Sequence, residues 1–281
     1  MSSDAPASII SILEPLLSGG RVPCSNDHCA DPICPTHRRD EIERVLAAAK
    51  GHVALERPPI SAAELAGLID HTLLRPDATI SDVERLCAEA MEHRFASVCV
   101  NPVFIPLCRA LTAGNGIPLG TVAGFPLGAA ATAIKAAEAE QAIRDGAAEI
   151  DMVMNIGLLR SGQYRFVAED IRAVTSVVRN HRKLCKVILE TALLTGEEKM
   201  RACLLAREAG ADFVKTSTGF ARGGATVDDV TLMRIVVGTG TGVKASGGIR
   251  TYEDAVSMIA AGANRIGTSS GVSIVTREGQ G

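Results

Sequence analysis

Residues 186–219 read KVILETALLTGEEKMRACLLAREAGADFVKTSTG, and they contain a complete strand–helix–strand pattern. The apolar runs at 186–191 and 212–217 predict two short, buried strands. The segment 197–208 between them has a helical composition, and Gly210 ends it. A strand, a helix and a second strand in this order are typical of the βαβ unit, whose two strands are parallel.

Similar apolar runs recur along the chain and predict eight strands. Their starts lie roughly 20–35 residues apart, which is the size of one βα unit. Eight such units close naturally into a TIM (β/α)8 barrel. An open doubly wound sheet is the rival fold, but no GxGxxG motif follows the first strand. The expected strands are 68–73, 97–100, 119–124, 149–155, 186–191, 212–217, 242–246 and 265–268.

Helical patterns fill the segments between the expected strands. The sequences SAAE at 61–64 and SDVE at 81–84 have the spacing of a capping box, and each predicts the start of a helix. Only about a dozen residues follow the eighth strand, which is too few for a full last helix. We therefore expect the helix predicted at 38–50 or the one at 61–67 to cover that part of the barrel.

The composition is that of a globular protein. The chain has 281 residues, of which 47% are hydrophobic, and its net charge is -3, so we expect no nucleic-acid partner. No stretch approaches the roughly 18 apolar residues of a membrane span. The apolar run at 7–17 contains Glu14 and Pro15 and makes a poor signal peptide. We therefore expect a cytoplasmic protein with its eight cysteines reduced.

Residues 1–59 differ from the rest and are interpreted as an N-terminal extension to a barrel domain over 60–281. The extension contains two helical patterns and a polar segment that is rich in cysteine and histidine. Thiolate and imidazole are preferred zinc ligands, but the spacing also suits free surface thiols or redox disulfides. All three interpretations stay open from the sequence. The residues concerned are Cys24, His28, Cys29, Cys34 and His37.

Two lysines lie inside apolar strands. Lys215 lies in ADFVKTSTG and Lys244 in GVKASGG. If the strands are neighbours, they are about 4.8 Å apart and the two amines interact. A free lysine has a pKa of about 10.4 and a nucleophilic amine needs about 7, a difference worth roughly 4 kcal/mol. An ammonium at about 4 Å supplies about 4 kcal/mol at an effective dielectric of about 20. The pair of lysines therefore predicts that one of them forms a Schiff base with a carbonyl substrate. The simpler alternative is that each lysine reaches solvent or pairs with a carboxylate and has no catalytic role.

Two carboxylates are placed to work with these lysines. In EIDMVMN, strand alternation puts Asp151 on the opposite face from Ile150 and Met152. If that face lines the barrel, Asp151 can move protons through water, and a structural ion pair is the alternative. Asp70 ends the first strand in the same way, and its alternative role is to hold a loop.

Glycines follow the last two strands, where barrels usually bind phosphate. Gly247 and Gly248 follow the seventh strand, and the eighth continues into GTSSG at 267–271. Backbone N–H groups in such turns can hold an anion, and Ser269 and Ser270 add hydroxyl donors. Each glycine pair alone is explained by a tight turn, but both at these two strands predict a phosphate site.

The same segments resemble the deoxyribose-phosphate aldolase family of class I aldolases. The resemblance runs from about residue 61 to 275, with a motif on every strand and in order. The motifs are LIDHTLL (68–74), SVCVNP (97–102), TVAGFPLG (121–128), EIDMV (149–153), KVILET (186–191), FVKTSTG (213–219), VKASGGIRT (243–251) and IGTSSG (266–271).

The resemblance implies an activity and a set of roles. The activity is reversible cleavage of 2-deoxy-D-ribose 5-phosphate to D-glyceraldehyde 3-phosphate and acetaldehyde in deoxyribose catabolism, without a metal or cofactor. By resemblance, Lys215 forms the imine, Lys244 lowers the pKa of Lys215, and Asp151 handles protons. The implied substrate-binding residues are Asp70, Cys99, Thr218, Gly219, Gly247, Gly248, Gly267, Ser269 and Ser270.

One departure and two rival functions remain. Some family members have a phosphate-binding lysine after TSTG, where this chain has Phe220, and Arg222 or Arg250 could compensate. Another Schiff-base enzyme, such as a transaldolase, or a non-catalytic phosphosugar-binding barrel would fit the same residues. Homodimers and higher homo-oligomers are equally compatible with the sequence.

Overall fold

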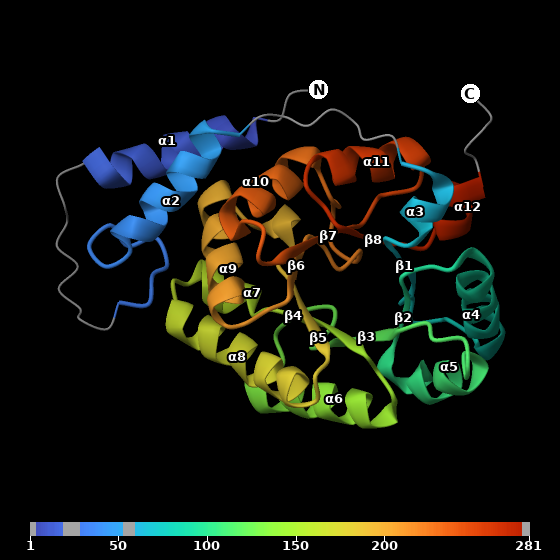
Figure 1. Cartoon of the computed structure of the whole chain (residues 1–281). Coiled ribbons are helices and arrows are strands. Elements are labelled where there is room, and N and C mark those ends of the chain that lie inside the picture. The colour runs from blue at the N-terminus through green and yellow to red at the C-terminus, as the bar shows by residue number, and fades with distance from the viewer. Residues whose placement is uncertain (1–3, 19–28, 53–59, 277–281) are drawn as a thin grey trace.

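The chain forms a closed barrel of eight parallel strands surrounded by helices, in a computed structural model that describes residues 4–18, 29–52 and 60–276. Each strand pairs with the next along the chain, and the eighth pairs with the first (Figure 1). The predicted TIM (β/α)8 barrel is therefore confirmed. Because all strands are parallel, their carboxyl ends lie at one mouth of the barrel, where such folds place their functional side chains.

The strands are β1 (Ile69–Leu73), β2 (Ser97–Val100), β3 (Leu119–Ala123), β4 (Glu149–Val153), β5 (Leu184–Ile188), β6 (Phe213–Lys215), β7 (Gly242–Ser246) and β8 (Arg265–Thr268). In the described parts of the chain, the α-helices are α1 (Ala5–Ser18), α2 (Arg39–Lys50), α3 (Ala62–Ala66), α4 (Ile80–His93), α5 (Ile105–Leu111), α6 (Thr132–Asp145), α7 (Ile156–Arg160), α8 (Tyr164–Asn180), α9 (Gly196–Glu208), α10 (Val227–Val237), α11 (Tyr252–Ala260) and α12 (Gly271–Thr276). Short 3₁₀ helices span Pro102–Phe104 and Thr191–Leu193.

Three predicted strands extend two or three residues too far at the barrel mouth. The strand expected at 149–155 is β4, which ends at Val153. The strand expected at 186–191 is β5, which begins at Leu184 and ends at Ile188. Glu190 then has a φ of 57°, a left-handed conformation that a strand does not allow. The strand expected at 212–217 is β6, which contains only the three residues Phe213–Lys215. In all three cases the chain leaves the strand earlier than expected and turns into a loop at the mouth.

The two predicted capping boxes have different outcomes. The one at Ser61 is present, because its hydroxyl accepts a hydrogen bond from the backbone N–H of Glu64. The one at Ser81 is wrong, because α4 begins one residue earlier, at Ile80. Thr79, in an extended conformation, caps this helix together with Asp82. The pair Thr79 and Asp82 has the same three-residue spacing as the expected pair Ser81 and Glu84. The extended backbone at Thr79 makes the first pair the cap.

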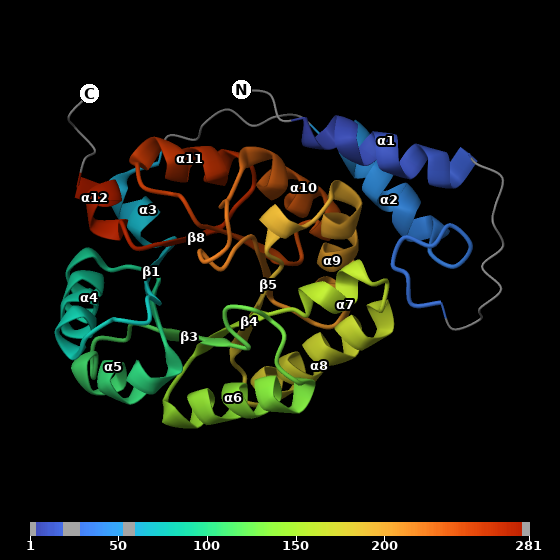
Figure 2. The same ribbon diagram turned by 180° about the vertical axis from the view of Figure 1, so that it is seen from behind.

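The wall beside the last strand is covered by two short helices. The helix α12 contains six residues, as the shortage of sequence after β8 predicts. It packs against α3 and against β1. Of the two helices expected to cover this region, α3 does so, whereas α2 packs with α1 and α10 elsewhere on the barrel (Figure 2).

The hydrophobic core continues from the barrel into the first two helices. Ile9 and Leu13 of α1 and Ile42 of α2 are buried and belong to the same apolar cluster as Val214 of β6. The division of the chain at residue 59 therefore stays a prediction. Across the ranges that the structure describes, no helix combines the length and the apolar character that a membrane span needs.

Candidate functional site

The two strand lysines lie next to each other inside the barrel. Lys215 and Lys244 are directly paired in the register of β6 and β7, and both side chains are buried. Each Nζ lies 2.8 Å from the same oxygen, Oδ2 of Asp151 on β4. The predicted contact between the lysines and Asp151 is therefore present, and a single carboxylate oxygen joins them.

A third lysine, Lys186, also contacts Asp151, and it was not among the site residues expected from the sequence. Lys186 of β5 donates to Oδ1 of Asp151 at 2.8 Å and to Glu149 at 2.5 Å. Lys186 is the register partner of Asp151 in the β4–β5 pair, so the two residues share one level of the barrel. A charged residue inside the apolar run LCKVI was the available signal, since fully buried lysines are rare.

Asp70 holds the network from the opposite wall. Its Oδ2 contacts the amine of Lys244, and its Oδ1 accepts hydrogen bonds from Ser97 at 2.7 Å and Arg265 at 2.6 Å. Asp70 is fully buried and does not line the cavity described below. The family resemblance implied that Asp70 lies beside the substrate, whereas in the structure it contacts Lys244 behind the cavity wall.

The charges of this network do not balance. It contains four cationic side chains and three carboxylates, so one positive charge has no buried counterpart among its members. Loss of a proton from one lysine would remove this surplus positive charge. Lys215 loses its proton most easily, because it contacts a single carboxylate, whereas Lys244 contacts two and Lys186 three. The cations are Lys186, Lys215, Lys244 and Arg265, and the carboxylates are Asp70, Glu149 and Asp151.

The pKa directions agree with this count. Burial lowers the pKa of Lys215, and the charge of Lys244 adds to that effect while Asp151 opposes it. Although burial alone would lower it, the pKa of Lys244 is raised by the carboxylates of Asp151 and Asp70. Burial would likewise raise the pKa of Asp151, but the three lysines hold that pKa well below its usual range. The result is an ionised Asp151, a cationic Lys244 and a Lys215 that loses its proton most easily.

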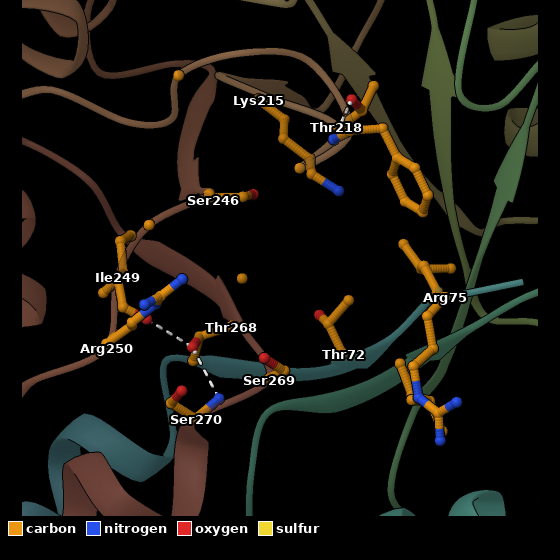
Figure 3. A pocket seen from close by; sticks show the side chains of 18 residues that line it. Thr72, Arg75, Lys215, Thr218, Ser246, Ile249, Arg250, Thr268, Ser269 and Ser270 are labelled. Atoms are coloured by element: carbon orange, nitrogen blue, oxygen red, sulfur yellow. Dashed lines mark hydrogen bonds between the residues drawn. The ribbon is translucent and has the colours of Figure 1, made fainter. Parts of the chain in front are cut away.

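Only one of the three lysines reaches the cavity at the barrel mouth. This cavity has a volume of about 590 Å³, and Lys215 lines it while Lys186 and Lys244 do not. In Figure 3 the amine of Lys215 points into the open space. Ligand sites of this kind usually measure about 300–1,000 Å³, so the cavity suits a small sugar. Lys215 is therefore the amine that a ligand can reach.

The rest of the cavity wall comes mainly from the loops after β6, β7 and β8. Arg250 and Arg75 also line the cavity (Figure 3), but the guanidinium of Arg75 is ion-paired with Asp77 and Asp82. Arg222, the other arginine considered as a substitute for the missing lysine, is not part of it. Of the expected substrate-binding residues, the structure brings together Thr218, Gly219, Gly247, Gly248, Gly267, Ser269 and Ser270 around this cavity.

Thr218 and Phe220, in the loop after β6, are each held by a residue from another loop. Glu190, buried after β5, accepts hydrogen bonds from the backbone N–H of Thr218 at 3.1 Å and from its hydroxyl. Phe220 is 50% exposed and packs edge-on against Phe125, with 5.3 Å between the ring centres. An aromatic ring thus occupies the place of the expected lysine, and Glu190 holds the loop that carries it.

Cys99 lies next to the lysine network and outside the cavity wall. It is buried on β2 in a small apolar group with Leu74 and Val122. Burial, followed by the negative charge of Asp151, raises the pKa of this thiol to about 11. Cys99 therefore stays protonated at neutral pH and fills space beside the network.

This fold and site define a class of proteins: barrel aldolases that act through a buried lysine. Residues 65–277 match the family described as DeoC/LacD family aldolase. A deoxyribose-phosphate aldolase from Carboxydothermus hydrogenoformans is 57% identical over 218 residues, which are 77% of this chain and 96% of that protein. One from Brevibacillus brevis is 59% identical over 208 residues, or 74% and 93% of the two chains.

A solved structure gives the same result. The tetrameric deoxyribose phosphate aldolase from Aeropyrum pernix superposes with a TM-score of 0.74 at 34% identity, covering 86% of this chain and 98% of that one. The chain belongs to the DeoC/LacD family of aldolases. It is an enzyme of the carbon–carbon lyase class, as the sequence resemblance implied.

Removing the second lysine tests the charge balance. In Lys244→Leu we expect turnover at neutral pH to fall by at least about 100-fold, because Asp151 then favours a protonated Lys215. The neutral amine is the reactive form, so the acidic limb of the kcat/KM profile should move to higher pH. A folded variant, checked by circular dichroism, with a near-normal rate and an unmoved limb would contradict this account.

Gly267 offers a test of the position of Lys244. A Cβ at this residue would lie 2.9 Å from Cε of Lys244 and 2.8 Å from Oγ of Ser246. We expect Gly267→Ala to displace the lysine and to lower kcat by about 10–100-fold, since misplacements near 1 Å have costs of this size. Gly240→Ala is the matched control, because no atom lies within 4 Å of the added Cβ. Equal rates in the two variants would show that Gly267 does not position Lys244.

Proposed function

We propose that the enzyme reversibly cleaves 2-deoxy-D-ribose 5-phosphate to D-glyceraldehyde 3-phosphate and acetaldehyde. The observation that carries the proposal is that the amine with the lowered pKa, that of Lys215, is also the amine that opens into the cavity. The curated relatives at 57% and 59% identity are named for the same substrate.

The proposed reaction begins with the neutral amine of Lys215. It adds to the aldehyde carbon C1 of the open-chain sugar, and loss of water gives an imine. The positively charged imine then accepts the electrons of the C2–C3 bond as the C3 hydroxyl loses its proton. This step releases D-glyceraldehyde 3-phosphate and leaves an enamine on Lys215. Protonation of the enamine at C2 and hydrolysis by water release acetaldehyde and restore the amine.

Asp151 and Lys244 have complementary roles in this proposal. Asp151 is ionised in the resting enzyme, and its Oδ2 lies 2.8 Å from the amines of both Lys215 and Lys244. This oxygen can therefore accept a proton from Lys215, and the positive charge of Lys244 lies on its other side. The same carboxylate stabilises the imine cation as it forms. In this proposal Asp151 takes up the proton of Lys215 only transiently, as the imine forms and is hydrolysed, and is ionised between these steps. Lys244 stays cationic, and its charge favours the neutral form of the Lys215 amine over the protonated form.

The phosphate of the substrate is proposed to lie against the loops after β7 and β8. Gly247 and Gly248 have φ values of 88° and 80°. Residues with side chains rarely adopt this left-handed backbone conformation, so glycine is favoured at both positions of the turn. Ser269 and Ser270 add donors, and Arg250 adds a positive charge in place of the lysine that Phe220 replaces. Thr218 and Gly219 then contact the sugar on the side of Lys215.

We also propose that the enzyme works as a homo-oligomer in the cytoplasm. The Aeropyrum pernix relative is described as tetrameric. In this chain, Ile134 of α6 and Phe166 of α8 are each more than half exposed, and these two helices pack side by side. A second copy of the chain packed over these two helices would cover both side chains.

Borohydride reduction in the presence of 2-deoxy-D-ribose 5-phosphate tests the function and separates it from non-catalytic binding. We expect a covalent adduct that peptide mapping places on Lys215, together with measurable release of acetaldehyde. The Lys215→Met variant is the control, and it should give neither adduct nor turnover. Turnover without an adduct, or an adduct confined to Lys244, would refute the proposed mechanism, and binding without either would support a phosphosugar-binding barrel.

A further inference from the structure

A second group of reactive side chains lies far from the lysine network in the chain, in the loop that precedes α2. The ligand atoms of Cys29, Cys34 and His37 all lie within 4.8 Å of one another. The Sγ of Cys34 is 3.5 Å from Nδ1 of His37. Within the described ranges, this is the group of three or more histidine, cysteine, aspartate or glutamate residues whose atoms could hold one metal ion.

We propose that these three residues bind a zinc ion in the N-terminal extension. Zinc lies at about 2.3 Å from a thiolate and about 2.0–2.1 Å from an imidazole nitrogen, in a tetrahedral arrangement. Those lengths place a bound sulfur and a bound nitrogen about 3.5–3.6 Å apart. The observed separation between Cys34 and His37 already has this value. Two thiolates also cancel the charge of the ion, so the site leaves no uncompensated charge on the barrel surface.

Local hydrogen bonds hold the segment that carries Cys34 and His37 in a tight turn. The carboxylate of Asp31 accepts a hydrogen bond from the backbone N–H of Ile33 at 3.0 Å. The N–H of Cys34 donates to the carbonyl of Asp31 at 3.2 Å, and the carbonyl of Cys34 accepts from the N–H of Arg38 at 2.8 Å. These bonds carry the chain from Cys34 into α2, so His37 lies within reach of the thiol.

The barrel supplies a fixed base for this turn. Arg201 of α9 binds both carboxylate oxygens of Asp31, at 2.9 and 3.1 Å. Arg38 forms a second two-point ion pair with Glu208 at the end of the same helix, at 3.2 Å for each bond. Ile33 is buried and anchors the turn between these two pairs. The ligands therefore lie on a rigid surface, which lowers the ordering cost of binding a metal.

Burial of the ligands indicates where the ion would sit. Cys34 is buried, Cys29 is half-buried and His37 is exposed, so the ion would be reached from the side of His37. The three residues provide three of the four bonds of a tetrahedral site; Cys24 and His28, the other two residues of the segment considered as zinc ligands, lie outside the residues that the structure describes. The site contacts α9 from outside and shares no residue with the barrel mouth. We therefore assign it a structural role, in which the ion fixes the turn to the barrel wall.

Zinc binding to the full-length, reduced protein tests this proposal. After removal of metal with a chelator, titration with zinc followed by native mass spectrometry should show one ion per chain. Cys34→Ser and His37→Ala should each weaken binding by more than about 100-fold, which exceeds the losses typical of residues that only support a ligand. The control is Cys203→Ala, which removes a buried thiol of α9 and should leave zinc affinity unchanged.

Cobalt and stability measurements complete the test. Substitution with cobalt should give the visible bands of a tetrahedral ion and a thiolate charge-transfer band that decreases in Cys34→Ser. Zinc should raise the Tm of the wild type and leave that of the variants unchanged. Retention of one zinc in the combined Cys29→Ser, Cys34→Ser, His37→Ala variant would overturn the proposal. So would a metal-free wild type in excess zinc, or a Cys29–Cys34 disulfide that forms under reducing conditions. Aldolase turnover serves to show that each variant is folded.

Discussion

One carboxylate oxygen, Oδ2 of Asp151, lies 2.8 Å from the amines of both Lys215 and Lys244, and the reactivity of the site depends on this shared contact. An isolated buried charge is costly, and a protein relieves it by changing the protonation state of the group. With four cations and three carboxylates, the network favours a single neutral amine. The neutral amine is Lys215, because the carboxylates that stabilise charge on Lys244 and Lys186 are more numerous than those around Lys215.

The barrel makes this arrangement possible through its register. Adjacent parallel strands hold paired residues at a fixed separation, so Lys215 and Lys244 cannot move apart without breaking the sheet. Gly267 on β8 leaves the space that the side chain of Lys244 fills. The loops that follow the strands carry other residues of the cavity wall, including Phe220 and Arg250. The strands therefore hold the lysine network, and the loops form most of the cavity wall.

Much of this could be predicted from the sequence, for physical reasons that differ from residue to residue. Strand alternation separated Asp151 from Ile150 and Met152 but left open which face lines the barrel. The order of the expected strands made the two lysine strands neighbours if the barrel formed. The contacts of Lys186 with Glu149 and of Arg265 with Asp70 were missed. Such contacts depend on strand register and on closure of the barrel between β8 and β1, which no local pattern encodes.

The ends of elements were the weakest part of the sequence interpretation. The left-handed backbone at Glu190 and the cap at Thr79 depend on the surrounding tertiary structure more than on residue type. The role of Asp70 shifted for a related reason, since a carboxylate at a strand end contacts either a ligand or its neighbours, and only the packing decides. The grouping of Cys29, Cys34 and His37 likewise follows from a turn held by Asp31 and Arg201.

The titration of individual lysine amines tests the central claim most directly. Lysine labelled at the ε position can be followed by NMR against pH in the ligand-free enzyme, with assignments from Lys215→Arg and Lys244→Arg. The account predicts that Lys215 loses its proton below the value of a free lysine, about 10.4, while Lys244 remains charged above it. A Lys215 that titrates at or above the free value, or a Lys244 that becomes neutral first, would contradict it.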